Sequence, residues 1–266
     1  MKKNFRLLGV RCWVLGVRCW VLGVRCWMLG VGCWVLGVTN ATAQRVTYRS
    51  TQHYNERVEL FERLDDIDST KIVMLGNSLT ENAINFGDWK TLLRVPNVVN
   101  RGISGDDALG ITSRLVQILP YKPKAIFLMC GTNDMSHHLT AEQVFYKVKG
   151  VIDSIRSGAP ETMLYVQSLL PINEGFGRWK NLVGRTDDIP VTNDLLRQYC
   201  EEQGIQFINI FPYLTARGGG KAKNVLIRYL SVDGLHLSRP GYEIWAQHLQ
   251  PYIDEVNWEE YLKKAQ

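Results

Sequence analysis

Four short segments of this 266-residue chain carry the side chains that acyl transfer uses. Gly76-Asn77-Ser78-Leu79-Thr80 supplies a hydroxyl, and residues 101–106 supply backbone N–H groups in a loop with two glycines. Asn133 supplies an amide, and Asp233 with His236 supplies a base and a carboxylate to orient it. Hydrolysis of an ester requires a nucleophile, a base and donors for the developing oxyanion. The four segments together therefore predict acyl transfer.

Each segment taken alone also has a structural explanation. Ser78 with Glu81 fits an S-x-x-E helix cap. The glycines of residues 101–106 fit a turn before a helix, and the loop lacks the spacing and lysine of a phosphate-binding P-loop. Asn133 is a residue type that favours turns. An Asp and a His three positions apart often form a cap or a surface pair, so only the joint occurrence favours chemistry.

The apolar pattern predicts where these segments lie. Residues 71–75 form a short apolar run before Gly76, which is typical of a strand buried on both faces. Similar runs occupy residues 97–100, 125–130, 162–167 and 206–210. Helical patterns occupy residues 107–119, 141–157, 191–203 and 240–253. Thr140 and Gln143 form a capping box that fixes the start of the second helix.

Alternation of strands and helices of these lengths predicts an α/β fold, a three-layer sandwich with a five-stranded parallel sheet. Ligands of such sheets bind outside the carboxyl ends of the strands. The first three candidate segments directly follow strands, so we expect them to meet at one edge of the sheet.

From about Lys71 to Ile253 the sequence resembles the SGNH hydrolases, also called GDSL esterases and lipases. Gly76-Asn77-Ser78-Leu79 resembles the first block, with Asn77 in place of the more frequent Asp. Gly102 matches the glycine of the second block, and Asn133 matches the asparagine of the third. Asp233 and His236 match the D-x-x-H of the last. The resemblance implies a flavodoxin-like sheet and neither a metal nor an organic cofactor.

The resemblance also implies roles for these residues. Ser78 would attack an ester carbonyl, His236 would take and later return its proton, and Asp233 would orient the imidazole. The oxyanion would be held by the backbone N–H groups of Ser78 and Gly102 and by the amide of Asn133. A non-catalytic binding protein with the same fold is the competing class.

The substrate is expected to be set by loops. Residues 169–189 form a long segment that could wall the site, and residues 217–228 form a second glycine-rich and basic segment. The candidate substrate-binding residues are Asn77, His137, Arg178 and Trp179. We find no long apolar lid, so a short acyl group on a carbohydrate or other polar alcohol is favoured, acetyl above all. Lysophospholipid or thioester hydrolysis is the alternative activity.

The charge of the chain is concentrated in its first 43 residues. The whole chain has 31 basic and 26 acidic residues, and residues 1–43 hold six of the basic ones and no acid. The remaining 223 residues therefore carry 25 basic and 26 acidic residues, a net charge of −1. A basic stripe typical of nucleic-acid binding is missing from the body, so we expect no nucleic-acid partner.

The same leader predicts export. A seven-residue unit repeats from Leu8 to Val38, residues 26–38 are uncharged and mostly apolar, and Ala41-Thr42-Ala43 follows. This is the order of a signal peptide cleaved before Gln44, which predicts a periplasmic or extracellular protein with no stable membrane span after cleavage. An uncleaved anchor, or a start codon placed too far upstream, is the alternative. The expected division is residues 1–43 as signal peptide, 44–70 as lead-in, 71–255 as hydrolase domain and 256–266 as tail.

Cysteine usage points to no further chemistry. Four of the six cysteines lie in the leader, and Cys130 and Cys200 alone lie in the body. Two cysteines make no disulfide framework, and no spacing of metal ligands accompanies them. We expect both to be buried free thiols. The pattern carries no signal of the oligomeric state.

Overall fold

The computed structural model describes residues 11–14, 17–20, 51–216 and 223–265. The chain divides into two compact units, Met1–Thr47 and Tyr48–Gln266, and each is described by itself. In the first unit, β1 (Arg11–Val14) pairs antiparallel with β2 (Val17–Trp20). The predicted apolar region 26–38 and the cleavage site before Gln44 lie outside the described residues, as do residues 217–222 of the second loop.

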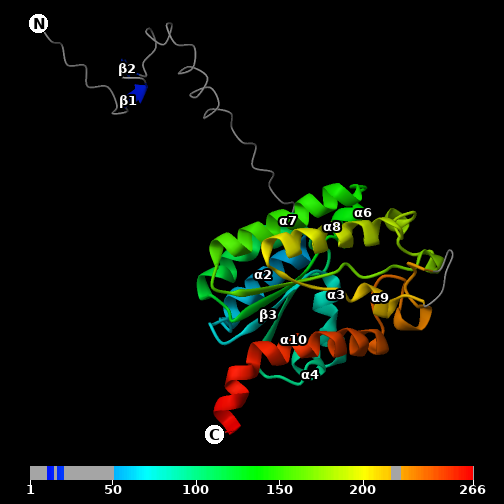
Figure 1. The fold of residues 1–266 in the computed structure, drawn as a ribbon. Coiled ribbons are helices and arrows are strands. Elements are labelled where there is room, and N and C mark those ends of the chain that lie inside the picture. The colour runs from blue at the N-terminus through cyan, green and yellow to red at the C-terminus, as the bar shows by residue number, and fades with distance from the viewer. Residues whose placement is uncertain (1–10, 15–16, 21–50, 217–222, 266) are drawn as a thin grey trace, which may run out of the picture. The chain divides into compact units, whose positions relative to one another are not determined.

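The second unit contains a five-stranded sheet, and the α/β class with a parallel sheet is confirmed (Figure 1). Its strands run in the order β4-β3-β5-β6-β7. Their bounds are β3 (Ile72–Gly76), β4 (Val98–Gly102), β5 (Ala125–Met129), β6 (Met163–Gln167) and β7 (Gln206–Ile208). Gly76 pairs with Gly102 and with Met129, so these three strands end at the same level.

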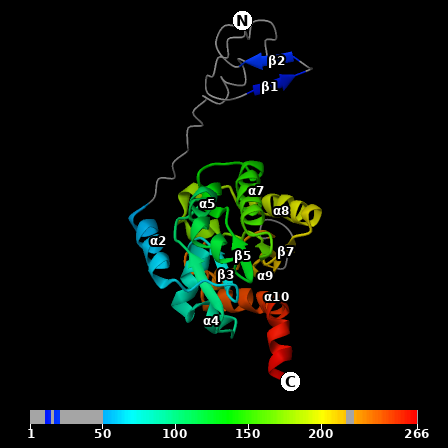
Figure 2. The same ribbon diagram turned by 90° about the vertical axis from the view of Figure 1, so that its left-hand side faces the viewer.

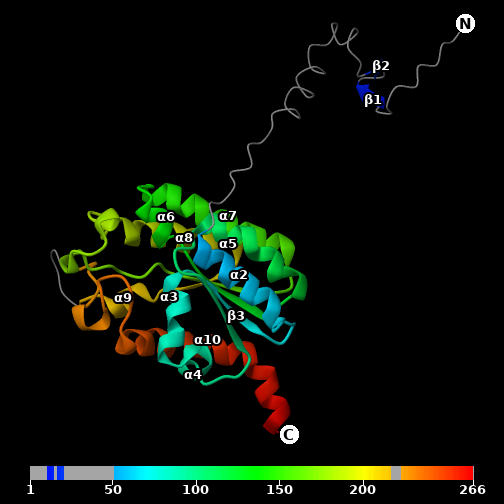
Figure 3. The same cartoon turned by 180° about the vertical axis from the view of Figure 1, so that it is seen from behind.

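Helices cover both faces of this sheet (Figure 3). One face packs against α5 (Ala108–Arg114), α7 (Ala141–Gly158) and α8 (Asp188–Gln203) through one apolar cluster. The other packs against α3 (Ser78–Glu81), α4 (Asp88–Leu92), α9 (Phe211–Leu214) and α10 (Arg239–Ala265) through a second cluster. The short helix α6 (Thr132–Ser136) follows β5. This is the expected three-layer arrangement.

The expected helices are present with shifted ends. The capping box of Thr140 and Gln143 is confirmed. Helix α5 ends at Arg114 and continues as tight 3₁₀ turns, one of which contains Pro120. Helix α8 starts at Asp188, because Pro190 falls in its first turn, where a missing N–H costs nothing. Helix α10 runs past Pro251 to Ala265, twelve positions beyond the expected end.

The lead-in holds a helix that the sequence pattern did not predict. Helix α2 (Gln52–Leu64) is capped by Thr51 and lies beside α5, to which the Tyr54 hydroxyl donates a hydrogen bond at the Gly110 carbonyl (2.9 Å; Figure 2). Only Tyr54 and Phe61 of this helix are buried, so its apolar face is too narrow to read from the sequence. No helix in the described ranges is long and apolar enough to cross a membrane.

Three aromatic side chains hold α10 and α4 to the sheet. Trp89, Tyr242 and Trp245 are each fully buried, and the two indoles meet edge to face with centroids 4.9 Å apart. Trp245 Nε1 also donates to Gln167 Oε1 at the end of β6 (2.7 Å). Cys130 and Cys200 are buried and free, as expected, and burial raises the pKa of both thiols.

Replacement of Trp245 by Ala should lower the free energy of unfolding by about 3 to 5 kcal/mol, because it opens a cavity and leaves Gln167 without its donor. Trp258 on the same helix is 59% exposed, so Trp258→Ala should change the free energy of unfolding by less than about 1 kcal/mol. Urea unfolding of both variants measures the difference. Equal losses would contradict this placement of α10.

Candidate active site

Ser78 lies at a tight junction between strand and helix. Gly76 ends β3, Asn77 is the N-cap of α3, and Ser78 is the first residue of that helix. A Cβ at Gly76 would stand 2.5 Å from the Met129 carbonyl oxygen, so only glycine allows the chain to turn there. Because Asn77 is the cap, the S-x-x-E capping interpretation of Ser78 is wrong.

Asp233 and His236 share a loop that is closed by its own hydrogen bonds. The Asp233 Oδ1 atom accepts the backbone N–H groups of Leu235 (3.0 Å) and His236 (2.8 Å). Its Oδ2 lies 2.8 Å from His236 Nδ1. Gly234 has a φ of +93°, and a Cβ there would stand 2.4 Å from the Asn173 carbonyl oxygen. The loop therefore requires a glycine and packs against residues 169–189.

The structure brings Ser78, His236 and Asp233 into one hydrogen-bonded chain. His236 Nε2 lies 2.9 Å from Ser78 Oγ, across 158 positions of sequence. Burial alone would raise the pKa of the Asp233 carboxyl, but the hydrogen bonds from His236 and Leu235 outweigh it and hold that pKa below its usual range. An ionised Asp233 favours the tautomer with its proton on Nδ1, which leaves Nε2 as an acceptor for the Ser78 hydroxyl.

Gly102 does not present a free N–H to this chain, and the expectation for it is corrected. Its N–H donates to Asn100 Oδ1 at 2.9 Å. A Cβ at Gly102 would stand 2.1 Å from the Glu81 nitrogen, so the glycine is required by close packing of β4 against α3. The sequence offered two glycines in one loop and did not tell which amide is engaged.

Gly105, in the same loop, is not among the site residues expected from the sequence. It is exposed, it has a φ of +82°, and its backbone N–H has no acceptor among the described residues. Both neighbours are fixed: Ser104 donates its N–H to Glu81 Oε2, and the Asp106 carbonyl accepts from Asn133 Nδ2 at 2.7 Å. The sequence signal that could have indicated Gly105 is the Ser-Gly-Asp turn, in which a glycine supplies the positive φ.

Asn133 is oriented by the bond to Asp106, which leaves a second amide hydrogen for another acceptor. Asp106 is itself fully buried and pairs with Arg114 Nε at 2.8 Å. Arg114 Nη2 donates to the Gly76 carbonyl (3.0 Å), two residues before Ser78. This buried ion pair thus connects the end of β3 to the loop after β4, and the Asp106 carbonyl of that loop accepts the Asn133 hydrogen bond.

The four expected substrate residues have different surroundings. Asn77 is 1% exposed and accepts the Leu79 N–H (3.0 Å), so its side chain caps α3 and is corrected from substrate contact to structural cap. Trp179 is exposed, and its ring meets the His236 imidazole edge to face with centroids 5.2 Å apart. Arg178 is exposed beside it. His137 is exposed, with Nδ1 3.8 Å from Asp107 Oδ2.

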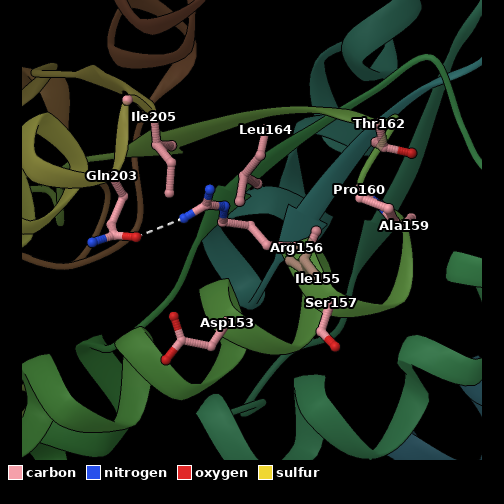
Figure 4. A pocket seen from close by; sticks show the side chains of 11 residues that line it. Asp153, Ile155, Arg156, Ser157, Ala159, Pro160, Thr162, Leu164, Gln203 and Ile205 are labelled. Atoms are coloured by element: carbon pink, nitrogen blue, oxygen red, sulfur yellow. Dashed lines mark hydrogen bonds between the residues drawn. The ribbon is translucent and has the colours of Figure 1, made fainter.

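A groove at the amino ends of the strands is separate from the Ser78, His236 and Asp233 cluster. It has a volume of about 470 Å³ and is lined by the ends of α7 and α8 and the start of β6 (Figure 4). Arg156 crosses it to donate to Gln203 Oε1 at 2.8 Å. In the ranges that the structure describes, no group of three His, Cys, Asp or Glu side chains is placed to hold a metal ion.

The sequence is similar to known esterases. Residues 74–244 match the model of the GDSL-like Lipase/Acylhydrolase family. A GDSL esterase/lipase of Arabidopsis thaliana is 23% identical over 71% of this chain and 80% of its own length. The platelet-activating factor acetylhydrolase IB subunit alpha1 of Bos taurus is 29% identical over 65% of this chain and 70% of its own.

Solved structures show the same fold. A GDSL-like lipase from Bacteroides thetaiotaomicron superposes with a TM-score of 0.63 at 18% identity, covering 76% of this chain and 98% of that one. A carbohydrate acetylesterase family member from Sinorhizobium meliloti superposes with a TM-score of 0.53 at 17% identity, covering 70% and 98%. The family model covers more than half of the chain, and the chain therefore belongs to the GDSL-like Lipase/Acylhydrolase family.

Proposed function

We propose that this GDSL-type ester hydrolase uses Ser78, His236 and Asp233 to remove a short acyl group, acetyl above all, from a carbohydrate or other polar alcohol. The observation that carries the proposal is the hydrogen-bonded chain from Ser78 Oγ through His236 to Asp233, with contacts of 2.9 and 2.8 Å. These distances lie within the range for a nucleophile and base in contact.

The reaction has two halves. Ser78 Oγ attacks the ester carbonyl carbon while its proton moves to His236 Nε2, and the ionised Asp233 stabilises the resulting imidazolium. The C–O bond to the alcohol then breaks, and His236 returns the proton to the leaving alkoxide oxygen. In the second half, water gives a proton to His236 and attacks the acyl-enzyme. The acid leaves, and Ser78 Oγ recovers its proton.

The oxyanion is held by three donors in this proposal. They are the Ser78 and Gly105 backbone N–H groups, which have no acceptor among the described residues, and the second amide hydrogen of Asn133. The Gly105 N–H thus replaces the Gly102 N–H, which the family resemblance implied as an oxyanion donor. A fixed set of donors in a partly desolvated site stabilises the tetrahedral intermediate without reorganisation.

The surroundings of His236 support a polar alcohol as the leaving group. Because His236 returns a proton to that alcohol, the alcohol must lie beside the imidazole, where the exposed indole of Trp179 stands. An exposed indole offers a flat apolar face to a sugar ring and an N–H to its hydroxyls. Two proteins similar in sequence or fold are described as an acetylhydrolase and as a carbohydrate acetylesterase family member.

Ser78→Ala should reduce hydrolysis of p-nitrophenyl acetate by about 10⁴-fold or more, since the nucleophile is removed. The exposed Ser157→Ala serves as the matched control and should keep full activity. Rates on the acetate, butyrate, octanoate and palmitate esters, with acetylated sugars alongside, test the substrate class. A rise toward palmitate would favour lipid hydrolysis, and a folded wild-type protein inactive on every ester would favour a binding protein.

Asn133→Ala should lower kcat by about 10²- to 10³-fold, with little change in KM, because the lost donor acts on the oxyanion and not on the ground-state ester. Steady-state kinetics on p-nitrophenyl acetate measures both constants. Asn55→Ala, an exposed change on α2, is the control. Full activity of the Asn133 variant would remove this residue from the mechanism.

We further propose export of the protein, supported by the order of basic residues, apolar stretch and Ala41-Thr42-Ala43 in the leader. Amino-terminal sequencing of protein recovered from the periplasm or medium of a secreting bacterial host should give a chain that begins at Gln44. A chain that keeps residues 1–43 would contradict this proposal.

A further inference from the structure

Glu81 connects the Ser78 helix to the loop that carries Gly105. It is the last residue of α3, and its side chain is 11% exposed. Its Oε2 atom accepts the backbone N–H of Ser104 at 2.5 Å. Ser104 directly precedes Gly105, so this bond fixes one side of the peptide whose N–H we place at the oxyanion.

Two side chains of α2 reach the same carboxylate. Arg57 Nε lies 3.1 Å from Glu81 Oε1, and His53 Nε2 lies 3.1 Å from both oxygens. Arg57 Nη2 also donates to the Gly102 carbonyl at 3.5 Å, so one guanidinium contacts the last residue of α3 and the last residue of β4. The side chain of Arg57 is only 17% exposed, whereas that of His53 is 46% exposed.

Packing sets α2 in this position. Tyr54 and Phe61 of the helix form a small buried cluster with Ile103, the residue before Ser104. Phe61 also lies under two guanidinium groups, those of Arg57 and Arg101, each within 5 Å of the ring centroid. The position of Arg57 is therefore determined by apolar and cation–π contacts as well as by its charge.

The charge of Glu81 depends on these neighbours. Burial would raise the pKa of the Glu81 carboxyl, but the hydrogen bonds from Ser104 and His53 and the charge of Arg57 outweigh it and lower that pKa. An ionised acceptor holds a backbone N–H more tightly than a neutral one. A buried carboxylate that lost its cation would be costly and would tend to take up a proton.

We propose that α2 belongs to the active site, because Arg57, acting through Glu81, positions the Ser104-Gly105 peptide so that the Gly105 N–H faces the oxyanion. Arg57 and Glu81 are positioning residues that do not touch the substrate. The inference rests on the proposed function and deepens it, since it assigns part of the oxyanion hole to a helix of the lead-in. Neither residue belongs to a block by which the sequence resembles its family.

The test compares Arg57→Gln and Glu81→Gln with Arg63→Gln and Glu56→Gln, two exposed changes on α2. On p-nitrophenyl acetate, both positioning variants should lose about tenfold to 100-fold in kcat, because a small displacement of one donor weakens transition-state binding. Their KM should stay within about twofold of the wild-type value, and the controls should keep wild-type kinetics. Arg57→Lys, which keeps a cation, should recover part of the loss.

A double variant separates this coupling from two independent effects. If Arg57 acts through Glu81, Arg57→Gln combined with Glu81→Gln should lose no more kcat than Glu81→Gln alone. Multiplied losses, a rise in KM in place of a fall in kcat, or full activity in folded Arg57→Gln would overturn the proposal. Thermal unfolding identifies which variants are folded.

Hydrogen exchange tests the same contact without relying on activity. The Ser104 amide should be protected in the wild-type protein and should exchange about tenfold faster in Arg57→Gln, with no change in Arg63→Gln. Unchanged exchange of the Ser104 amide in Arg57→Gln would overturn the proposal, whatever the activity of that variant. A wild-type protein inactive on all esters, with faster exchange in Arg57→Gln, would instead reject the proposed function and retain the positioning contact.

Discussion

The contact of 2.9 Å between Ser78 Oγ and His236 Nε2 joins two segments 158 positions apart, and most of the fold serves to hold its two ends. Ser78 is fixed by β3, whose five residues are all buried, and by the tight turn at Gly76. His236 is fixed by a loop that leads into α10, and α10 is held to the sheet by Trp245. Displacement of either element would separate the His236 imidazole from the Ser78 hydroxyl.

The parallel sheet also brings together the loops that carry the proposed oxyanion donors. Strands β3, β4 and β5 end at one level, so the segments that follow them converge without long excursions. Polar contacts then make the convergence precise. The pair of Asp106 and Arg114 links the Gly76 carbonyl to the loop after β4, and Asn133 binds the Asp106 carbonyl. Glu81 binds the same loop from the side of α3.

The site is also built from segments that carry no catalytic motif. Residues 169–189 contribute the Trp179 ring beside His236 and the Asn173 carbonyl against Gly234. Helix α2 contributes Arg57 and His53 to Glu81. These contacts explain why a motif of a few residues needs a complete domain around it: each motif residue has neighbours from distant parts of the chain that restrict its position.

The sequence by itself located the five strands and four of the helices along the chain, and its motifs singled out Ser78, Asn133, Asp233 and His236 as candidate site residues. Apolar runs and residue types are local properties that can be read directly from the sequence. The tertiary structure alone showed which glycine amide is free: among the described residues the Gly102 N–H donates to Asn100, whereas the Gly105 N–H has no acceptor. It alone decided that Asn77 is a cap and that α2 reaches Glu81. These are pairings of polar groups across the chain, and a pairing depends on distances that residue type and spacing do not encode.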